Sequence, residues 1–149
     1  MPGSMSLNTD FPRLHQSGFV ETSPADRTYN CIAFAAGRSD AWWEPVAAPG
    51  YYWPPSVQSD ESVDALTRLF ETLGYEQCMD GRYEPGYDRV AIYANGTEYS
   101  HAALQVREEW WVSKLGKSID IQHKLGALEG GIYGHVARFL RRPRLTREG

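Results

Sequence analysis

The sequence predicts an α+β fold in which N-terminal helices pack on an antiparallel sheet. Two observations carry the prediction: helical patterns come first along the chain, and strand patterns separated by short turns follow them. That order is typical of the α+β class. The 149 residues, of which 42% are hydrophobic, suffice for one domain with an apolar core. We expect a loop segment over 1–26, the domain over 27–143 and a basic tail over 144–149.

Two helices are predicted in the first half of the chain. A short one covers 31–36 and ends at Gly37, a residue type that commonly terminates helices. A longer one begins after a cap at Ser59 or Asp60 and ends at Gly74. Its apolar residues recur at spacings of three and four and form one apolar face: Val63, Leu66, Phe70 and Leu73.

Strand patterns fill most of the second half. Asn95-Gly96 is a strong signal for a tight turn, and Glu108-Glu109 suits a second short hairpin connection. The last element before the tail is expected to be a strand that follows a helical turn. The predicted strands are 87–94, 101–106, 110–115 and 132–140, and the helical turn is 125–128.

Composition excludes several classes of function. The net charge of −4 gives no general attraction to nucleic acid or to an anionic membrane, and the C-terminal arginines are expected to form a solvated basic tail. Residues 1–10 lack the basic and apolar regions of a signal peptide, and no stretch approaches the length of a membrane span. We expect a cytoplasmic protein, or one exported without a cleaved signal.

Cys31 is the candidate nucleophile, because it follows a loop and starts a helix, where backbone N–H groups stabilise a thiolate. The alternatives are a buried small hydrophobe or a Cys31–Cys78 disulfide, although two cysteines do not make a disulfide framework. His101 is the preferred general base over His123, because it opens a strand and small residues follow it.

A third group should orient the His101 ring, and Ser113 and Asp120 both qualify by position. Tyr29 and Asn30 precede the cysteine and are candidates to support an oxyanion. No pair of Cys or His residues has the spacing of a zinc site, and no glycine-rich phosphate loop occurs. We therefore expect neither a metal nor another cofactor.

Large aromatic residues and prolines crowd the segment over 41–55, which predicts a long irregular loop. Such a loop either covers an edge of the core or forms one wall of a substrate groove. The candidate groove residues are Trp42, Trp43, Tyr52 and Trp53.

The segment Tyr29-Asn30-Cys31-Ile32-Ala33-Phe34 resembles the nucleophile segment of NlpC-type papain-fold hydrolases, and His101-Ala102-Ala103 resembles their histidine strand. The third polar residue of that superfamily, commonly a histidine, falls on Ser113. The chain also resembles a group of uncharacterised bacterial domains over about 27–143. That pattern consists of the two motifs above, an aromatic loop, Ser113-Lys114-Leu115-Gly116, Ile121, His123 and Tyr133-Gly134.

The resemblance implies a papain-like fold and a thiol hydrolase of the cysteine peptidase type. We expect a cysteine-dependent hydrolase or acyl-transferase that cleaves an amide, isopeptide or ester bond through an acyl-thioenzyme. Its substrate would be a peptide or protein, in preference to a peptidoglycan peptide. The alternatives are a deamidase or transglutaminase-type effector, and an inactive papain-fold module that binds ligands through the aromatic loop.

Overall fold

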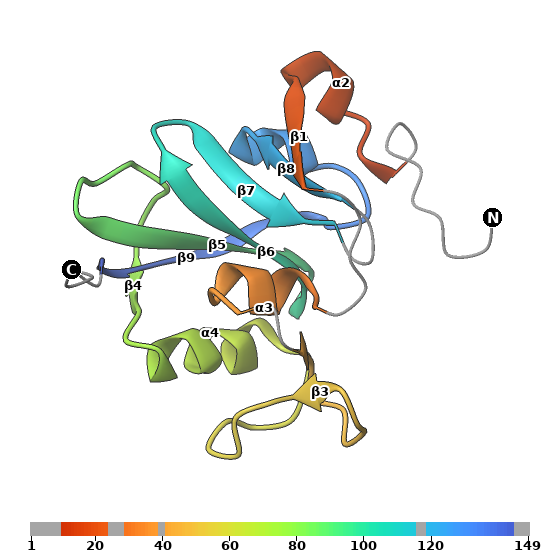
Figure 1. Ribbon diagram of the computed structural model, residues 1–149, viewed down its shortest axis with the longest axis vertical. Coiled ribbons are helices and arrows are strands. Elements are labelled where there is room, and N and C mark those ends of the chain that lie inside the picture. The colour runs from red at the N-terminus through yellow and green to blue at the C-terminus, as the bar shows by residue number, and fades with distance from the viewer. Residues whose placement is uncertain (1–9, 24–28, 39–40, 116–118, 145–149) are drawn as a thin grey trace.

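The computed structural model describes residues 10–23, 29–38, 41–115 and 119–144, and one seven-stranded sheet dominates it (Figure 1). All neighbouring strands in this sheet run antiparallel, in the order β1-β8-β7-β6-β5-β9-β4. The strands are β1 (Phe19–Ser23), β4 (Glu76–Cys78), β5 (Tyr87–Asn95), β6 (Glu98–Arg107), β7 (Trp110–Lys114), β8 (Asp120–His123) and β9 (His135–Pro143).

The expected papain-like α+β fold is wrong. The described chain is mostly antiparallel sheet, and its longest helix has only 10 residues. The error arose because strands form where none was predicted: residues 19–23, within the expected loop segment, pair with residues 120–123 and extend the sheet. Short strands of this kind carry little local pattern, since their hydrogen bonds go to distant partners.

The described residues form three short α-helices: α2 (Leu14–Ser17), α3 (Cys31–Ala35) and α4 (Val63–Thr72). The predicted position of α4 is confirmed, but its cap is Ser62, whose side chain accepts a hydrogen bond from the Ala65 N–H at 3.0 Å. The predicted helical turn is the 3₁₀-helix η1 (Leu125–Leu128). A separate parallel pair, β2 (Trp42–Trp43) and β3 (Tyr51–Tyr52), lies beyond α3 and α4 (Figure 1).

The sheet separates two hydrophobic clusters. On one face, α3 and α4 pack against alternate residues of β5 and β6, including Ile92 and Ala102 (Figure 1). On the other face, Tyr93 and Ala103 pack with side chains from α2, η1 and Tyr133. The period of two along each strand sends successive side chains to opposite faces.

Both predicted hairpins are confirmed, although β6 begins three residues before His101. The ladder between β5 and β6 pairs Tyr93 with His101 and Ala94 with Tyr99, so Ser100 is an extra residue in a β-bulge. The bulge places Tyr99 in the cluster with α3, whereas His101 contacts Tyr93 and Tyr133 of the other cluster.

The last strand is shifted by three residues from its predicted start. Gly131 to Gly134 form a turn, and the positive φ of 71° at Gly134 is a conformation that glycine adopts without strain. The arginines expected in a solvated tail lie in or beside β9 and pair with acids on neighbouring elements, as far as residue 144. Arg147 lies outside the described residues.

Candidate functional site

The core of the candidate site is a chain of three buried polar side chains on neighbouring strands. The His101 Nε2 atom of β6 lies 2.9 Å from the Ser113 hydroxyl of β7. The same hydroxyl lies 2.7 Å from His123 Nε2 of β8, and His123 Nδ1 lies 2.7 Å from the Lys124 carbonyl. All three side chains have no measurable exposure. We call His101, Ser113 and His123 the relay.

The hydrogen-bond partners determine where the relay protons sit. A carbonyl only accepts, so His123 Nδ1 carries the proton that it donates to Lys124. In a neutral ring, His123 Nε2 must then accept, and the Ser113 hydroxyl donates to it. The remaining lone pair of Ser113 accepts from His101 Nε2–H. The second nitrogen of His101, Nδ1, is therefore an unprotonated acceptor.

Burial keeps both imidazoles neutral. It lowers the pKa of His123 to about 4, against an opposing contribution from the Lys124 carbonyl. Burial, followed by the neighbouring charge on His123, lowers the pKa of His101 well below the ordinary value of 6.5. The relay is accordingly uncharged at neutral pH, which is the state that the hydrogen-bond pattern requires.

His101 Nδ1 has no hydrogen-bond partner among the described residues, although it is buried. Aromatic rings hold its imidazole on two sides. Tyr133 stacks on it with ring centroids 4.1 Å apart, and Tyr93 meets it edge-on at 5.4 Å. A Cβ on Gly134 would lie 2.2 Å from the Ala94 carbonyl oxygen, so glycine is needed where the chain brings Tyr133 to this position.

Cys31 is the first residue of α3, which packs against β6 and β7 on the face of the sheet that carries Ala102 and Leu104. The register between β6 and β7 ends at Leu104 and Val112, and beyond it the His101 side chain of β6 is joined to Ser113 of β7 by a hydrogen bond. Burial raises the pKa of the Cys31 thiol to about 11, against hydrogen bonds from backbone N–H groups that include that of Ala102. The thiol therefore lies beside Ala102, in the cluster on the α3 face of the sheet, whereas the His101 ring packs with Tyr93 and Tyr133 of the other cluster.

No hydrogen bond joins the Cys31 thiol to the His101 ring among the described side chains. Cys31 is a free thiol with 9% of its surface exposed, and Cys78 is also free. The raised pKa means that the Cys31 sulfur is protonated at neutral pH. The expected thiolate is therefore not the form that this environment stabilises.

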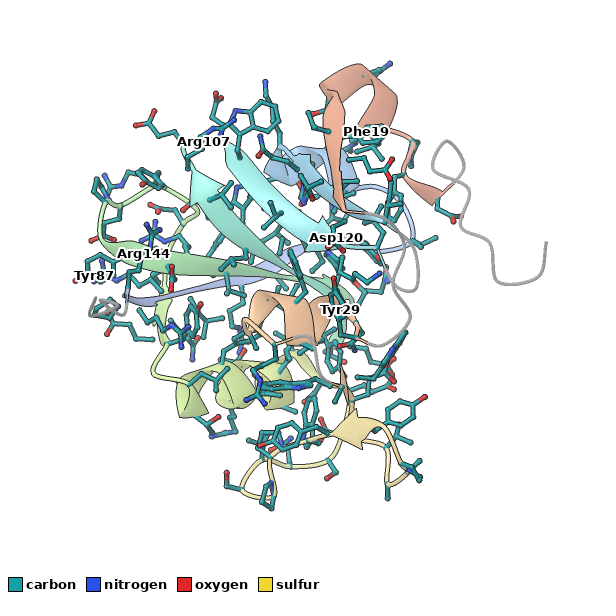
Figure 2. All side chains as sticks on the ribbon, viewed as in Figure 1. Phe19, Tyr29, Tyr87, Arg107, Asp120 and Arg144 are labelled. Carbon is teal, nitrogen blue, oxygen red and sulfur yellow. The ribbon has the colours of Figure 1, made fainter. Side chains whose placement is uncertain are left out.

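Asp120, the alternative to Ser113 as the group that orients His101, lies elsewhere. It accepts a hydrogen bond from the Tyr29 hydroxyl at 3.2 Å (Figure 2), and it pairs in register with Lys114 across β7 and β8. The buried Lys114 ammonium lies 5.3 Å from the centroid of the Tyr29 ring. Tyr29 and Asp120 thus contact each other, whereas Ser113 contacts His101.

Asn30, expected to support an oxyanion, ties α3 to β2. Its side-chain oxygen accepts hydrogen bonds from the backbone N–H groups of Ala33 and Trp43, both at 3.1 Å. Its amide group donates to the Trp43 carbonyl at 3.1 Å. Asn30 is thus both the N-cap of α3 and the anchor of the aromatic loop.

The four aromatic candidates have different environments. Trp43 is buried with 4% exposure, whereas Tyr52 is 43% exposed. Trp42 lies edge-on to Tyr51 in the parallel pair, and Trp53 donates its indole N–H to the Gln58 carbonyl at 3.0 Å. Part of the loop therefore covers the core and part of it faces solvent.

The sequence favours His101 over His123 as the general base and assigns no role to Tyr133. Both contact the candidate site, His123 through Ser113 and Tyr133 through its ring. The alternation of side chains along β8 could have identified His123 as a buried residue. Ile121 and His123 face the same side of the sheet as Trp111 of β7. No group of three His, Cys, Asp or Glu side chains in the described part of the chain could hold a metal ion.

The class of protein follows from these features: an antiparallel sheet domain with a buried histidine–serine–histidine relay on one face of the sheet and a cysteine-bearing helix packed on the other. Residues 20–141 match the family model described as Domain of unknown function (DUF7689), and the chain belongs to that family. Comparisons with curated proteins and with solved structures found no match. No described helix is long and apolar enough to cross a membrane.

Proposed function

We propose that this protein is a cysteine-dependent hydrolase or acyl-transferase in which Cys31 is the nucleophile and His101 the general base. One observation carries the proposal: His101 has a buried, unpartnered Nδ1 atom whose acceptor state is imposed by the relay. A buried polar atom without a partner costs free energy, and functional sites are a common reason for its retention. The resemblance of residues 29–34 to an NlpC-type nucleophile segment supports the same role for Cys31.

The chemistry starts from a neutral thiol and a neutral imidazole. As the Cys31 sulfur attacks the carbonyl carbon, the thiol proton moves to His101 Nδ1, and the C–S bond forms while the carbonyl π electrons move to oxygen. When the tetrahedral intermediate collapses, the bond to the leaving group breaks and that group takes the proton from His101. The lowered pKa of His101 favours this return of the proton.

Water or an amine then attacks the carbonyl carbon of the acyl-thioenzyme and gives a proton to His101 Nδ1. The C–S bond breaks, and the Cys31 sulfur takes this proton and returns to the neutral thiol. Water gives hydrolysis or, on a glutamine side chain, deamidation, whereas an amine gives transamidation. Backbone N–H groups beside the sulfur, those of Cys31, Ile32 and Ala102, are the candidate donors to the oxyanion. Ser113 and His123 act as positioning residues, because they set the tautomer of His101 without touching the reacting atoms.

The test is acylation by p-nitrophenyl acetate in a Cys78→Ser background, where Cys31 is the sole thiol. We expect one acetyl group on Cys31 by intact-mass analysis and peptide mapping. His101→Gln should slow this step by about 10²- to 10⁴-fold, the usual contribution of a general base. Acylation of Cys31 at the same rate in both proteins would contradict the proposal, as would its absence in the parent.

A second candidate is a binding domain without catalysis. Tyr51 and Tyr52, exposed by 41% and 43%, favour it because large aromatic side chains are costly to leave in water. An unreactive Cys31 in the acylation experiment, together with ligand binding by the aromatic loop, would favour this alternative.

A further inference from the structure

A concave surface on the aromatic loop lies outside the relay. Its volume is about 410 Å³, within the size range of small-ligand pockets. Three consecutive aromatic residues, Tyr51, Tyr52 and Trp53, form one side of it, and Pro45 and Val46 line another part. We call this surface the aromatic pocket.

The walls of the aromatic pocket are held in place by contacts behind them. Tyr52 packs on the buried Trp43 with ring centroids 4.9 Å apart. Trp53 stacks on Tyr99 at 6.3 Å with ring planes 9° apart. The rings are therefore preorganised, and the exposed faces of Tyr51 and Tyr52 are open to a ligand.

The segment that carries the aromatic pocket is acidic. From Ala41 to Thr67 the sequence contains no lysine, arginine or histidine and four carboxylates. Asp64 is paired with Arg138 at 2.8 Å. Glu44, Asp60 and Glu61 make no ion pair with any basic side chain in the described ranges. Glu44 and Asp60 directly flank the pocket residues Pro45 and Ser59 in sequence.

These carboxylates also affect each other and the groups near Cys31. Burial, followed by the charge of Glu61, raises the pKa of Glu44. Burial, followed by the charges of Glu44 and Cys31, raises the pKa of Tyr99, the residue on which Trp53 stacks. Trp53 and Tyr99 pack against the hydrophobic cluster that contains Cys31, so the aromatic pocket adjoins the cluster of the proposed nucleophile.

We propose that the aromatic pocket binds a cationic side chain, a lysine or an arginine, of a peptide or protein substrate. Aromatic faces attract cations through the ring quadrupole, and carboxylates without basic partners complement the same charge. The inference rests on the proposed function for the statement that the bound segment is a substrate. The binding preference itself does not need catalysis.

Binding is measured with the full chain carrying Cys31→Ala, so that no turnover occurs. The probes are acetyl-Gly-Lys-Gly-amide, the same peptide with an Nε-acetylated lysine, and acetyl-Gly-Glu-Gly-amide, followed by NMR chemical shifts. We expect the lysine peptide to bind at least about tenfold more tightly than the acetylated one, and less tightly as salt rises. Equal binding of the two peptides would overturn the inference.

Variants locate the binding surface. Tyr52→Leu and Glu61→Gln should each weaken binding of the lysine peptide several-fold, whereas Tyr52→Phe, which keeps the ring, should retain it. Glu71→Gln is the matched control, because Glu71 is an exposed carboxylate on α4. Unchanged binding in folded Tyr52→Leu would place the site elsewhere and overturn the inference. Selective binding with an unreactive Cys31 would contradict only the acyl-transfer proposal.

Discussion

The Tyr133 ring lies flat on the His101 imidazole, with centroids 4.1 Å apart and planes 7° apart. Tyr133 is itself fixed by its neighbours: Ser100 of the bulge donates a hydrogen bond to its carbonyl at 2.6 Å. The stacked ring excludes water from one face of the imidazole, and Ser113 holds Nε2. Together these contacts leave Nδ1 as the ring nitrogen without a hydrogen-bond partner among the described residues.

Removing the central hydroxyl of the relay should have two effects. Ser113→Ala leaves one nitrogen of each histidine buried without its partner, so we expect a loss of about 1–3 kcal/mol in the free energy of unfolding for each unpaired group. Without the serine, His101 also loses the contact that fixes its tautomer, so acylation of Cys31 should slow. Urea denaturation and the acylation assay measure the two effects.

Ser100→Ala is the matched control for Ser113→Ala. Like Ser113→Ala, it removes a serine hydroxyl that makes a hydrogen bond. The Ser100 hydroxyl donates to the Tyr133 carbonyl and lies outside the relay. We expect it to lower stability while leaving the tautomer of His101 unchanged in ¹⁵N spectra. A tautomer change in Ser100→Ala but not in Ser113→Ala would contradict the assignment.

The free energy of unfolding should decrease as pH is lowered, because His123 becomes protonated. Its pKa is 6.5 in the unfolded chain and about 4 in the folded one, so the unfolded chain binds the proton first as pH falls. The contribution of neutral His123 is therefore complete above pH 6.5 and is lost as pH falls to about 4. The free energy of unfolding, measured across this range, should depend less on pH in His123→Gln.

His135→Gln is the control for the pH experiment, because His135 is exposed and its Nδ1 lies 3.6 Å from Glu129. Its pH profile should follow that of the unmodified protein above pH 4. If His135→Gln flattened the profile as much as His123→Gln, burial of His123 would not be its cause.

The aromatic loop should divide into residues that stabilise the fold and residues that do not. Trp43→Ala removes a buried indole and should cost about 3–5 kcal/mol. Tyr51→Ala, at a residue with 41% exposure, should change stability by about 0.5 kcal/mol or less. Thermal melting curves compare the two variants, and equal losses would show that the loop is structural throughout.

Asn30 should be required for the junction between α3 and β2. Asn30→Ala removes three hydrogen bonds, so we expect a loss of about 2 kcal/mol or more, at the upper end for an N-cap. Asn30→Asp keeps the two bonds that its oxygen accepts and should restore part of the stability. If denaturation curves showed no difference between the two variants, capping would not explain the role of Asn30.

Several elements follow from local sequence alone. The β5–β6 hairpin turns where Asn95-Gly96 predicts: Asn95 ends β5, and Gly96 opens the two-residue connection with a positive φ of 63° that glycine adopts without strain. The spacing of apolar residues predicts α4, and Gly74 ends it with a φ of 93°. These features depend on residues close together in the chain, whose backbone preferences act wherever the segment lies.

The tertiary structure alone decided the rest. The Ser100 bulge sends His101 to the opposite face from Tyr99, which a regular alternation would not do. The choice of Ser113 over Asp120 required the pairing of β6, β7 and β8, since positions in sequence left both open. The sequence by itself determined which side chains could form a site. Long-range strand pairing and burial determined which of them meet, because the free energy of those contacts depends on the whole fold.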